Sequence, residues 1–261
     1  MVGPDELKRE TAAAELLTSA RSGHRQIDSL GPHAPQSVSE AHHIADLHAD
    51  LLGYGTVGWK IGATSTLAMQ LLNSPGPFPG RIFEGTIVAS GERASVEMVA
   101  PLVECEFGFW IGEDLPIRRE RYSLSDLRSA TEAVSPAIEL VDSRFADMLS
   151  VGYLSLIADS GANCGAIVGE KVAVADLPDL HDVSVSCQVD GEIVGEGSGH
   201  DILGDPWLAF EWLANHLAAR GLGLRTGDLV LSGTCTGITP LANASMVVAT
   251  FSDLGQVSFT R

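Results

Sequence analysis

Two glutamates stand two positions apart inside an apolar run, PLVECEFGFWIG at residues 101–112. Side chains at i and i+2 of a strand point to the same face, so Glu104 and Glu106 would project together from a strand. Carboxylates that are buried so close together repel each other, and one takes up a proton unless a cation lies between them. Oxygen ligands suit Mg²⁺ or Mn²⁺, and Glu139, in PAIELVD, is the candidate third ligand.

An ordinary polar strand face that points to solvent explains Glu104 and Glu106 equally well. Spacing in the sequence does not by itself bring Glu139 to the other two. The residues alone therefore predict no more than a candidate metal site.

Lys60 is the next candidate, because it lies between Trp59 and Ile61 in TVGWKIGAT. Buried lysines are rare unless they are paired with an acid, although a lysine on a strand also commonly points to solvent. The four cysteines form no C-x-x-C pair, and Cys235, in SGTCTG, has no histidine partner nearby in the sequence. We expect all four to be reduced thiols in the core.

The elements that must position these residues are mostly strands, preceded by two helices. Residues 1–55 are predicted to form an N-terminal helical cap region, and residues 56–261 a β-rich catalytic domain, within one compact unit. Helices are expected at 4–21, 37–53, 66–72, 123–134, 145–160 and 206–221, strands at 56–64, several short stretches of 82–112, 135–142, 163–172, 183–198, 227–234 and 246–260, and an irregular loop at 73–80.

The composition limits the kinds of partner. The chain has 261 residues and a formal net charge of −18, which argues against binding to nucleic acid or to an anionic membrane surface. Its charged start lacks the apolar stretch of a signal peptide, and no apolar run reaches transmembrane length. We therefore expect a cytoplasmic protein.

Several motifs occur in a characteristic order: GWKIGAT, ECEFGFWIGEDL, PAIELVDSR, ADSGANCGAIVG, LGDPWLAFEWLANHLAARGLGLRTGD and VLSGTCTG. Together they resemble the fumarylacetoacetate hydrolase superfamily, most closely the branch of 2-oxopent-4-enoate hydratases and 4-oxalocrotonate decarboxylases. The resemblance implies an α+β fold, with a mixed β-roll or sandwich core and the N-terminal helices as a cap. It also implies a small 2-oxo acid substrate and a homo-oligomer, alone or associated with a decarboxylase or hydratase of the same pathway.

The resemblance assigns roles to the candidate residues. Glu104, Glu106 and Glu139 match the three ligands of Mg²⁺ or Mn²⁺, and Lys60 matches a pocket lysine that stabilises charge or transfers a proton. The substrate-binding residues that it implies are Asp159, Ser160 and Asn163 in ADSGAN and Thr234 and Thr236 in SGTCTG.

One segment departs from the pattern of the hydratases. They often carry D-Q-P-D-F-G, with an aspartate for proton transfer, where this chain reads SPGPFPG at residues 74–80. The nearest acid is Glu84, a candidate catalytic residue. Either Glu84 or a bound water replaces the aspartate, or the reaction is a different one.

The sequence therefore predicts a metal-dependent lyase that adds water to a 2-hydroxydienoate or 2-oxo-4-enoate and gives a 4-hydroxy-2-oxo acid, as in aromatic meta-cleavage catabolism. The alternative is a decarboxylase of the 4-oxalocrotonate type. Further alternatives are an acylpyruvate C–C hydrolase and a non-catalytic partner subunit.

Overall fold

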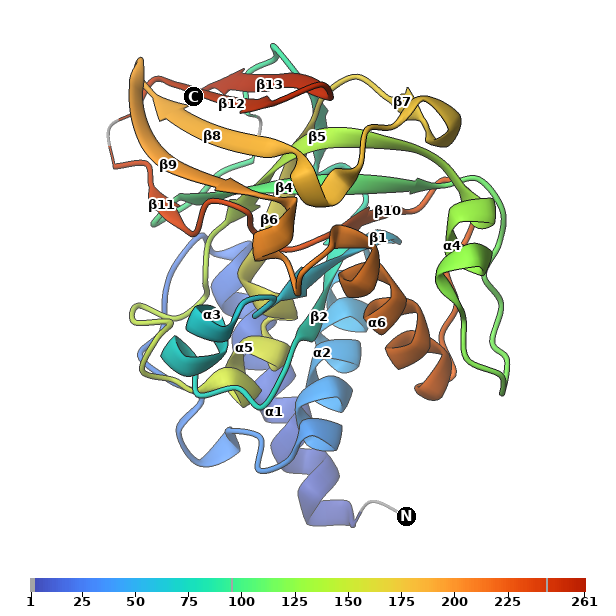
Figure 1. Ribbon diagram of the computed structural model, residues 1–261. Coiled ribbons are helices and arrows are strands. Elements are labelled where there is room, and N and C mark those ends of the chain that lie inside the picture. Colours follow the sequence, from blue (N-terminus) through green and yellow to red (C-terminus); the bar gives the residue numbers. More distant parts are fainter. Residues whose placement is uncertain (1–2, 95, 243) are drawn as a thin grey trace.

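The structure, a computed structural model, describes residues 3–94, 96–242 and 244–261. A four-stranded sheet, a larger mixed sheet and a group of helices follow one another from top to bottom in Figure 1. The larger sheet has nine strands: β2, β1, β10, β4, β5, β6 and β3 in spatial order, with β11 paired to β4 and β7 to β5. These strands are β1 (Thr56–Gly62), β2 (Phe78–Phe83), β3 (Ile87–Ala89), β4 (Leu102–Ile111), β5 (Thr131–Val141), β6 (Asn163–Val168), β7 (Val172–Ala173), β10 (Leu229–Leu231) and β11 (Thr239–Pro240).

The larger sheet is rolled. β2 lies at one end of the strand order, yet it also contacts β6 near the other end. Pairing is antiparallel except for β1 with β10 and β3 with β6. The mixed, rolled sheet with helices at the N-terminus confirms the predicted α+β fold class.

The second sheet covers one face of this roll and completes the main core. Its order is β13, β12, β8 and β9, with bounds β8 (Ser184–Val189), β9 (Glu192–Ser198), β12 (Met246–Phe251) and β13 (Gly255–Thr260). Phe107 of β4 meets Phe251 of β12 edge to face, with ring centroids 5.3 Å apart. β8 and β9 form a hairpin within the stretch expected as strand at 183–198, and Asp190 and Gly191 at its turn both have positive φ, at 49° and 90°.

Helices cover the lower part of the molecule in Figure 1. α1 (Pro4–Ser22) packs on α2 (Val38–Leu52), and α2 packs on α5 (Tyr153–Ala158), far along the chain. The predicted limits of α2 are confirmed, because the Ser37 hydroxyl accepts a hydrogen bond from the Glu40 amide and Gly53 ends the helix at φ 71°. α6 (Pro206–Ala219) lies beside α4 (Leu124–Ala130), and α3 (Thr66–Leu71) is a short exposed helix. The boundary at residue 55 stays a prediction.

Two predicted helices are shorter in the structure. The helix expected at 123–134 ends at Ala130, and β5 starts at once with Thr131. There Thr131 and Ala133 pair with Ile111 and Trp110 of β4, so ladder hydrogen bonds override the local helical preference. The expected helix at 145–160 is limited to α5, because Gly152 has φ 79° and turns precede it.

Two strands also differ from the prediction. Residues 78–80 were expected in a loop but belong to β2, where Pro79 pairs with Ile61. Proline is tolerated there because β2 is at the end of the strand order and need not donate to a further strand. The strand expected at 163–172 is divided into β6 and β7. The four cysteines are free and buried, as predicted.

Among the described residues, no helix combines the length and the apolar character needed to cross a membrane.

Candidate metal centre

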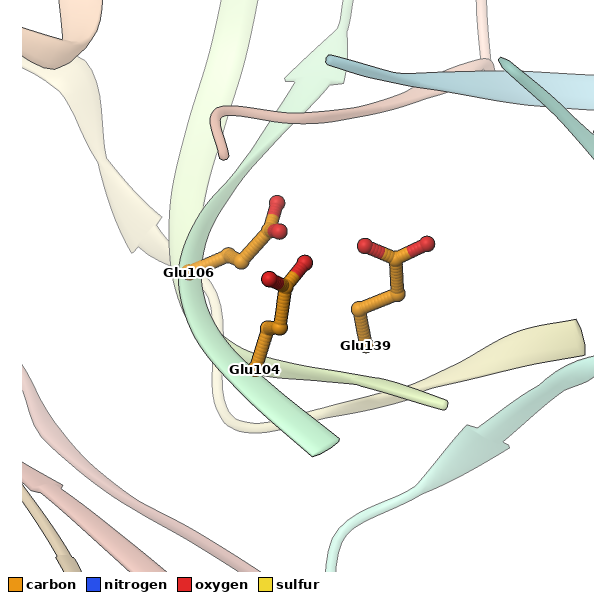
Figure 2. Close-up of side chains that lie close together, drawn as sticks. All are labelled: Glu104, Glu106 and Glu139. Carbon is orange, nitrogen blue, oxygen red and sulfur yellow. The ribbon is translucent and has the colours of Figure 1, made fainter. Parts of the chain in front are cut away.

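The register of two long strands brings the three glutamates together. Glu104 of β4 is the direct cross-strand partner of Glu139 of β5, and Glu106 lies two residues further along β4. Figure 2 shows the three carboxylates converging from these strands. Each offers a carboxylate oxygen, and these oxygens all lie within 4.8 Å of one another. The antiparallel pairing of β4 with β5 therefore brings Glu139 to Glu104 and Glu106, which sequence spacing alone did not predict.

Lys60 of β1 is the cation beside this cluster. Its Nζ lies 3.2 Å from Oε2 of Glu139, and the side chains of Lys60 and Glu139 are 4% and 0% exposed. Glu106 is also fully buried, and Glu104 is half-buried. Three carboxylates and one ammonium leave two negative charges in excess, which one divalent cation would neutralise.

The uncompensated charge shifts the pKa values of the cluster. Burial, together with repulsion from Glu139, raises the pKa of Glu104 to about 7 although Lys60 opposes the shift. Burial also raises the pKa of Glu106 well above its usual value, and the other two glutamates add to the shift. For Lys60, burial favours the neutral amine, but the three carboxylates, Glu139 foremost, raise its pKa above the ordinary value.

Further hydrogen bonds orient two of the three carboxylates. The Gly233 amide donates to Oε2 of Glu106 at 2.7 Å, and the Asn163 side-chain amide donates to Oε1 of Glu139 at 2.8 Å. Oε1 of Glu106 is buried without a hydrogen-bond partner among the described residues. A buried acceptor with no donor, in a cluster with excess negative charge, is the environment expected of a metal ligand. The residues therefore fit a divalent cation.

A cavity of about 60 Å³ opens onto Lys60 and Glu104. Thr64 and Thr234 are the hydroxyl residues in its wall, and Gly161 belongs to the 159–163 segment. The rest of the wall is apolar or backbone: Ile61, Gly62, Ala63, Ala68, Leu72, Phe78, Val141, Met148, Leu156 and Ile238.

The 159–163 segment reaches this cavity in an unusual conformation. Ser160 and Ala162 have φ of 52° and 62°, and Gly161 has φ of 65°. A Cβ on Gly161 would lie 3.0 Å from Cε of Lys60, so the backbone passes directly over the lysine stem. Oγ of Ser160 is buried without a hydrogen-bond partner among the described residues. Loops held in such conformations are common at ligand sites.

Asp159 holds this segment in place through its contacts with Arg144. Its Oδ1 lies 2.8 Å from Nε of Arg144, and its Oδ2 accepts a hydrogen bond from the Arg144 amide at 3.0 Å. Burial raises the pKa of Asp159, although Arg144 opposes that shift. The Asp159 carboxylate thus pairs with Arg144 and does not join the glutamate cluster.

The structure unites some predicted site residues and separates others. Lys60, the three glutamates and Asn163 form one cluster, and Thr234 lines its cavity. Glu84 lies in the turn after β2 and lines a different cavity. Thr236 is not in the wall of the cavity at Lys60; its amide donates to Thr234 Oγ1 at 3.3 Å.

Three contributors were missed by the sequence reasoning. The Gly233 amide, Arg144 and Arg21, which donates to the Asn163 carbonyl at 3.0 Å, all support the site from distant parts of the chain. Arg144 ends the PAIELVDSR motif, and an arginine directly after a buried strand is a signal that could have been used. Arg21 carried no comparable signal on its helix.

Comparison with known proteins shows the family to which the chain belongs. Residues 83–260 match the model of the fumarylacetoacetate (FAA) hydrolase C-terminal domain. The chain belongs to the fumarylacetoacetate hydrolase family.

Relatives that match over almost the whole chain show which members of the family it is similar to. A "2-keto-4-pentenoate hydratase 1" from Dechloromonas aromatica is 32% identical over 260 residues, and a "2-keto-4-pentenoate hydratase" from Burkholderia vietnamiensis is 30% identical over 252 residues, each match covering 95% of both chains. Among solved structures, 4-oxalocrotonate decarboxylase from Pseudomonas putida G7, complexed with magnesium and adipate, superposes with a TM-score of 0.87 at 25% identity over 97% of both chains. The chain is thus similar to both kinds of lyase named by the resemblance in its sequence.

Proposed function

We propose that this protein is a metal-dependent hydratase that adds water to a small 2-hydroxydienoate and forms a 4-hydroxy-2-oxo acid. The observation that carries the proposal is the buried cluster of three glutamates and Lys60 beside an apolar cavity. The named function of the relatives that are 30–32% identical supports the same reaction.

Glu104, Glu106 and Glu139 are the residues that would hold Mg²⁺ or Mn²⁺. The solved relative that contains magnesium supports this choice of cofactor. When bound, the cation supplies Lewis acidity toward a 2-oxo group and its neighbouring carboxylate. Asn163 and the Gly233 amide hold two of the carboxylates in orientation.

The chain's own groups carry the rest of the chemistry. Lys60 is the ammonium in the cavity wall, so it is placed to hold a substrate carboxylate or to deliver a proton when the dienol becomes the conjugated ketone. The Gly161 backbone also lines the cavity, whereas the Thr234 hydroxyl there already donates to the Gly237 carbonyl at 3.0 Å. Water then adds at C4, with its hydroxyl on that carbon and its proton on C3. Ala68, Leu72 and Phe78 keep bulk water away.

The wall of the cavity favours hydration of a monocarboxylate over decarboxylation of a dicarboxylate. Within the described part of the chain, Lys60 is the only cationic side chain lining it, and Glu139 already pairs with that lysine. The apolar lining residues Leu72, Met148 and Ile238 offer no partner to a second carboxylate. A buried carboxylate without a partner is strongly disfavoured, so an apolar tail fits better.

Decarboxylation is the second candidate. It is favoured by the likeness to the decarboxylase structure and by the lack of an acid in residues 74–80. Glu84 lines another cavity, so its position does not support it as a replacement acid. Hydration would then use Lys60 and water for proton transfer.

Product identification by mass spectrometry separates the two reactions. The protein is stripped with EDTA, reloaded with Mg²⁺ or Mn²⁺, and incubated with 2-hydroxypenta-2,4-dienoate or with 2-oxohex-3-enedioate. Metal-dependent gain of water by the first substrate supports the proposal. Loss of carbon dioxide from the second without hydration of the first would replace it with the decarboxylase function.

A pair of variants on one strand tests the site itself. Glu139→Gln keeps the size of the side chain but removes one charge from the cluster, so Mg²⁺ affinity and turnover should fall together. Glu132→Gln is the matched control, because Glu132 is also on β5 but lies at the surface, paired with Lys171 at 3.0 Å. Full activity of Glu139→Gln would show that the three glutamates do not form the active site.

The assembly into homo-oligomers, an association with a pathway partner and the cytoplasmic location expected from the sequence remain predictions alongside this proposal.

A further inference from the structure

A second and larger cavity, of about 490 Å³, adjoins the end of β5, the strand that carries Glu139. It is lined by the end of α1, the turn after β2, residues 96–99 and the segment 142–144 that follows β5. None of its lining residues lines the cavity at Lys60. Its wall combines apolar side chains, among them Leu52 and Phe83, with three arginines: Arg21, Arg25 and Arg144.

Arg144 is almost completely buried in this wall. It is 4% exposed, and its Nη2 has no hydrogen-bond partner among the described residues. Its Nε faces Oδ1 of Asp159 at 2.8 Å, so one side of the guanidinium is paired and the other is not. A buried guanidinium with a free N–H group is costly unless an acceptor reaches it.

Arg21 lines the same cavity as Arg144. It stacks over the ring of Phe83, with 4.9 Å between its Cζ and the ring centroid, and Nη1 donates to the Asn163 carbonyl at 3.0 Å. Within the described ranges, it forms no ion pair with a carboxylate. Burial, with the repulsion of Arg144 next in size, lowers the pKa of Arg21 to about 10.

Three acids, Asp142, Glu84 and Glu97, also line the cavity. Asp142 accepts hydrogen bonds from the amides of Val99 and Ala100, at 2.8 and 3.0 Å. Glu84 and Glu97 belong to the exposed rim, where Glu97 lies 3.4 Å from Nε2 of His24. An acidic rim disfavours a large polyanion, whereas a small anion can pass it and reach the two arginines.

We propose that this cavity binds a small anion, through a carboxylate or phosphate group held by Arg21 and Arg144. Two guanidinium groups at one cavity can supply paired N–H donors to the two oxygens of such a group. The volume leaves room for a small organic body against Leu52 and Phe83. The cavity shares no lining residue with the cavity at Lys60, although Arg21 and Arg144 also contact Asn163 and Asp159 of the 159–163 segment.

Calorimetric titration of the full-length, Mg²⁺-loaded protein tests this proposal. Inorganic phosphate and benzoate are the two probes, and neither is a 2-oxo acid. Binding of phosphate alone identifies a phosphate group as the ligand, and binding of benzoate identifies a carboxylate; either result supports the site. Absence of binding by both probes overturns it.

Variants locate the binding. Arg21→Met keeps an apolar chain over Phe83 and should weaken the affinity for the bound probe by about tenfold or more, the effect of losing a charged hydrogen bond. Arg21→Lys keeps the charge without the fork and should also weaken it, which provides a test if the methionine variant does not fold. Arg9→Met, on the same helix but outside the cavity, is the control and should bind as the wild type does.

A last variant separates this cavity from the metal centre. Glu106→Gln should leave probe binding within about twofold of the wild type. Loss of binding in Glu106→Gln, or full binding in both Arg21 variants, would place the anion elsewhere and overturn the proposal. Failure of hydratase activity in the wild type would leave these titrations unaffected.

Discussion

A single methyl group at Gly80 should disrupt the candidate active site. Gly80 of β2 pairs with Lys60 of β1. A Cβ at this position would lie 2.1 Å from the Ser160 carbonyl oxygen and 3.1 Å from Cγ of Lys60. The strand therefore touches both the lysine and the 159–163 segment through a position that has no room for a side chain.

The size of the disturbance follows from these distances. Ordinary van der Waals contact begins at 3.4 Å, so Gly80→Ala requires the Ser160 carbonyl or β2 to move by about 1.3 Å. Misplacement of catalytic groups by about 1 Å can lower the rate about 10²-fold. Overpacking of this kind lowers the free energy of unfolding by about 1–3 kcal/mol, which a folded variant can tolerate.

The assay is the rate of hydration of 2-hydroxypenta-2,4-dienoate, with urea unfolding in parallel. Gly76→Ala is the matched control, since a Cβ at Gly76, in the same proline-rich segment, meets nothing within 4 Å and its φ is not positive. The control should keep wild-type kcat/KM. A folded Gly80→Ala protein with kcat/KM within about twofold of the wild type would refute the reasoning, because the contact would then not position the site.

Three further predictions concern stability. His48 is fully buried, and burial, then Arg21 and Arg144, lowers its pKa to about 3. Its folded pKa is below the unfolded value of about 6.5, so its contribution is lost as the pH falls below 6.5, at about 1.4 kcal/mol per pH unit. In urea unfolding, the free energy of unfolding of the wild type should fall by about 1.3 kcal/mol relative to that of His48→Gln as the pH decreases from about 7 to about 5.5. A difference between the two proteins that does not change with pH would contradict the assignment. Asp159→Asn leaves Arg144 buried without its counter-ion and should lower the free energy of unfolding by about 3–5 kcal/mol, measured by the same method; a loss under about 1 kcal/mol would mean that the pair is not needed. Mg²⁺ at about 100 times its dissociation constant should raise the free energy of unfolding by about 2.7 kcal/mol relative to EDTA, and an equal gain in Glu106→Gln would place the ion elsewhere.

The local pattern was enough to predict much of the fold. The glutamate spacing predicted that Glu104 and Glu106 share a strand face, and the local pattern of residues 37–53 predicted α2. These features depend on neighbours within a few residues, where propensity and side-chain direction act. Local preference was misleading at Thr131, because pairing with β4, distant in sequence, decides that β5 begins there.

The completed site depends on contacts that no local pattern encodes. Glu139 meets Glu104 through the register of two strands, and the Arg144–Asp159 pair forms when a strand end meets the 159–163 segment. The family resemblance implied that Glu139 meets Glu104, but it did not imply the pair of Arg144 and Asp159. Gly80 shows the same limit, since only the packed structure reveals that a carbonyl occupies the space of its missing side chain.

The rolled sheet has a consequence for the protein's resistance to aggregation. A free edge strand exposes a row of unpaired backbone groups on which another chain can add a strand. In this fold β2 ends the strand order, but it contacts β6 and the 160–162 turn, and its Pro79 has no N–H to offer. The same curvature that encloses the glutamates thus also protects the edge formed by β2 from strand addition by a neighbouring molecule.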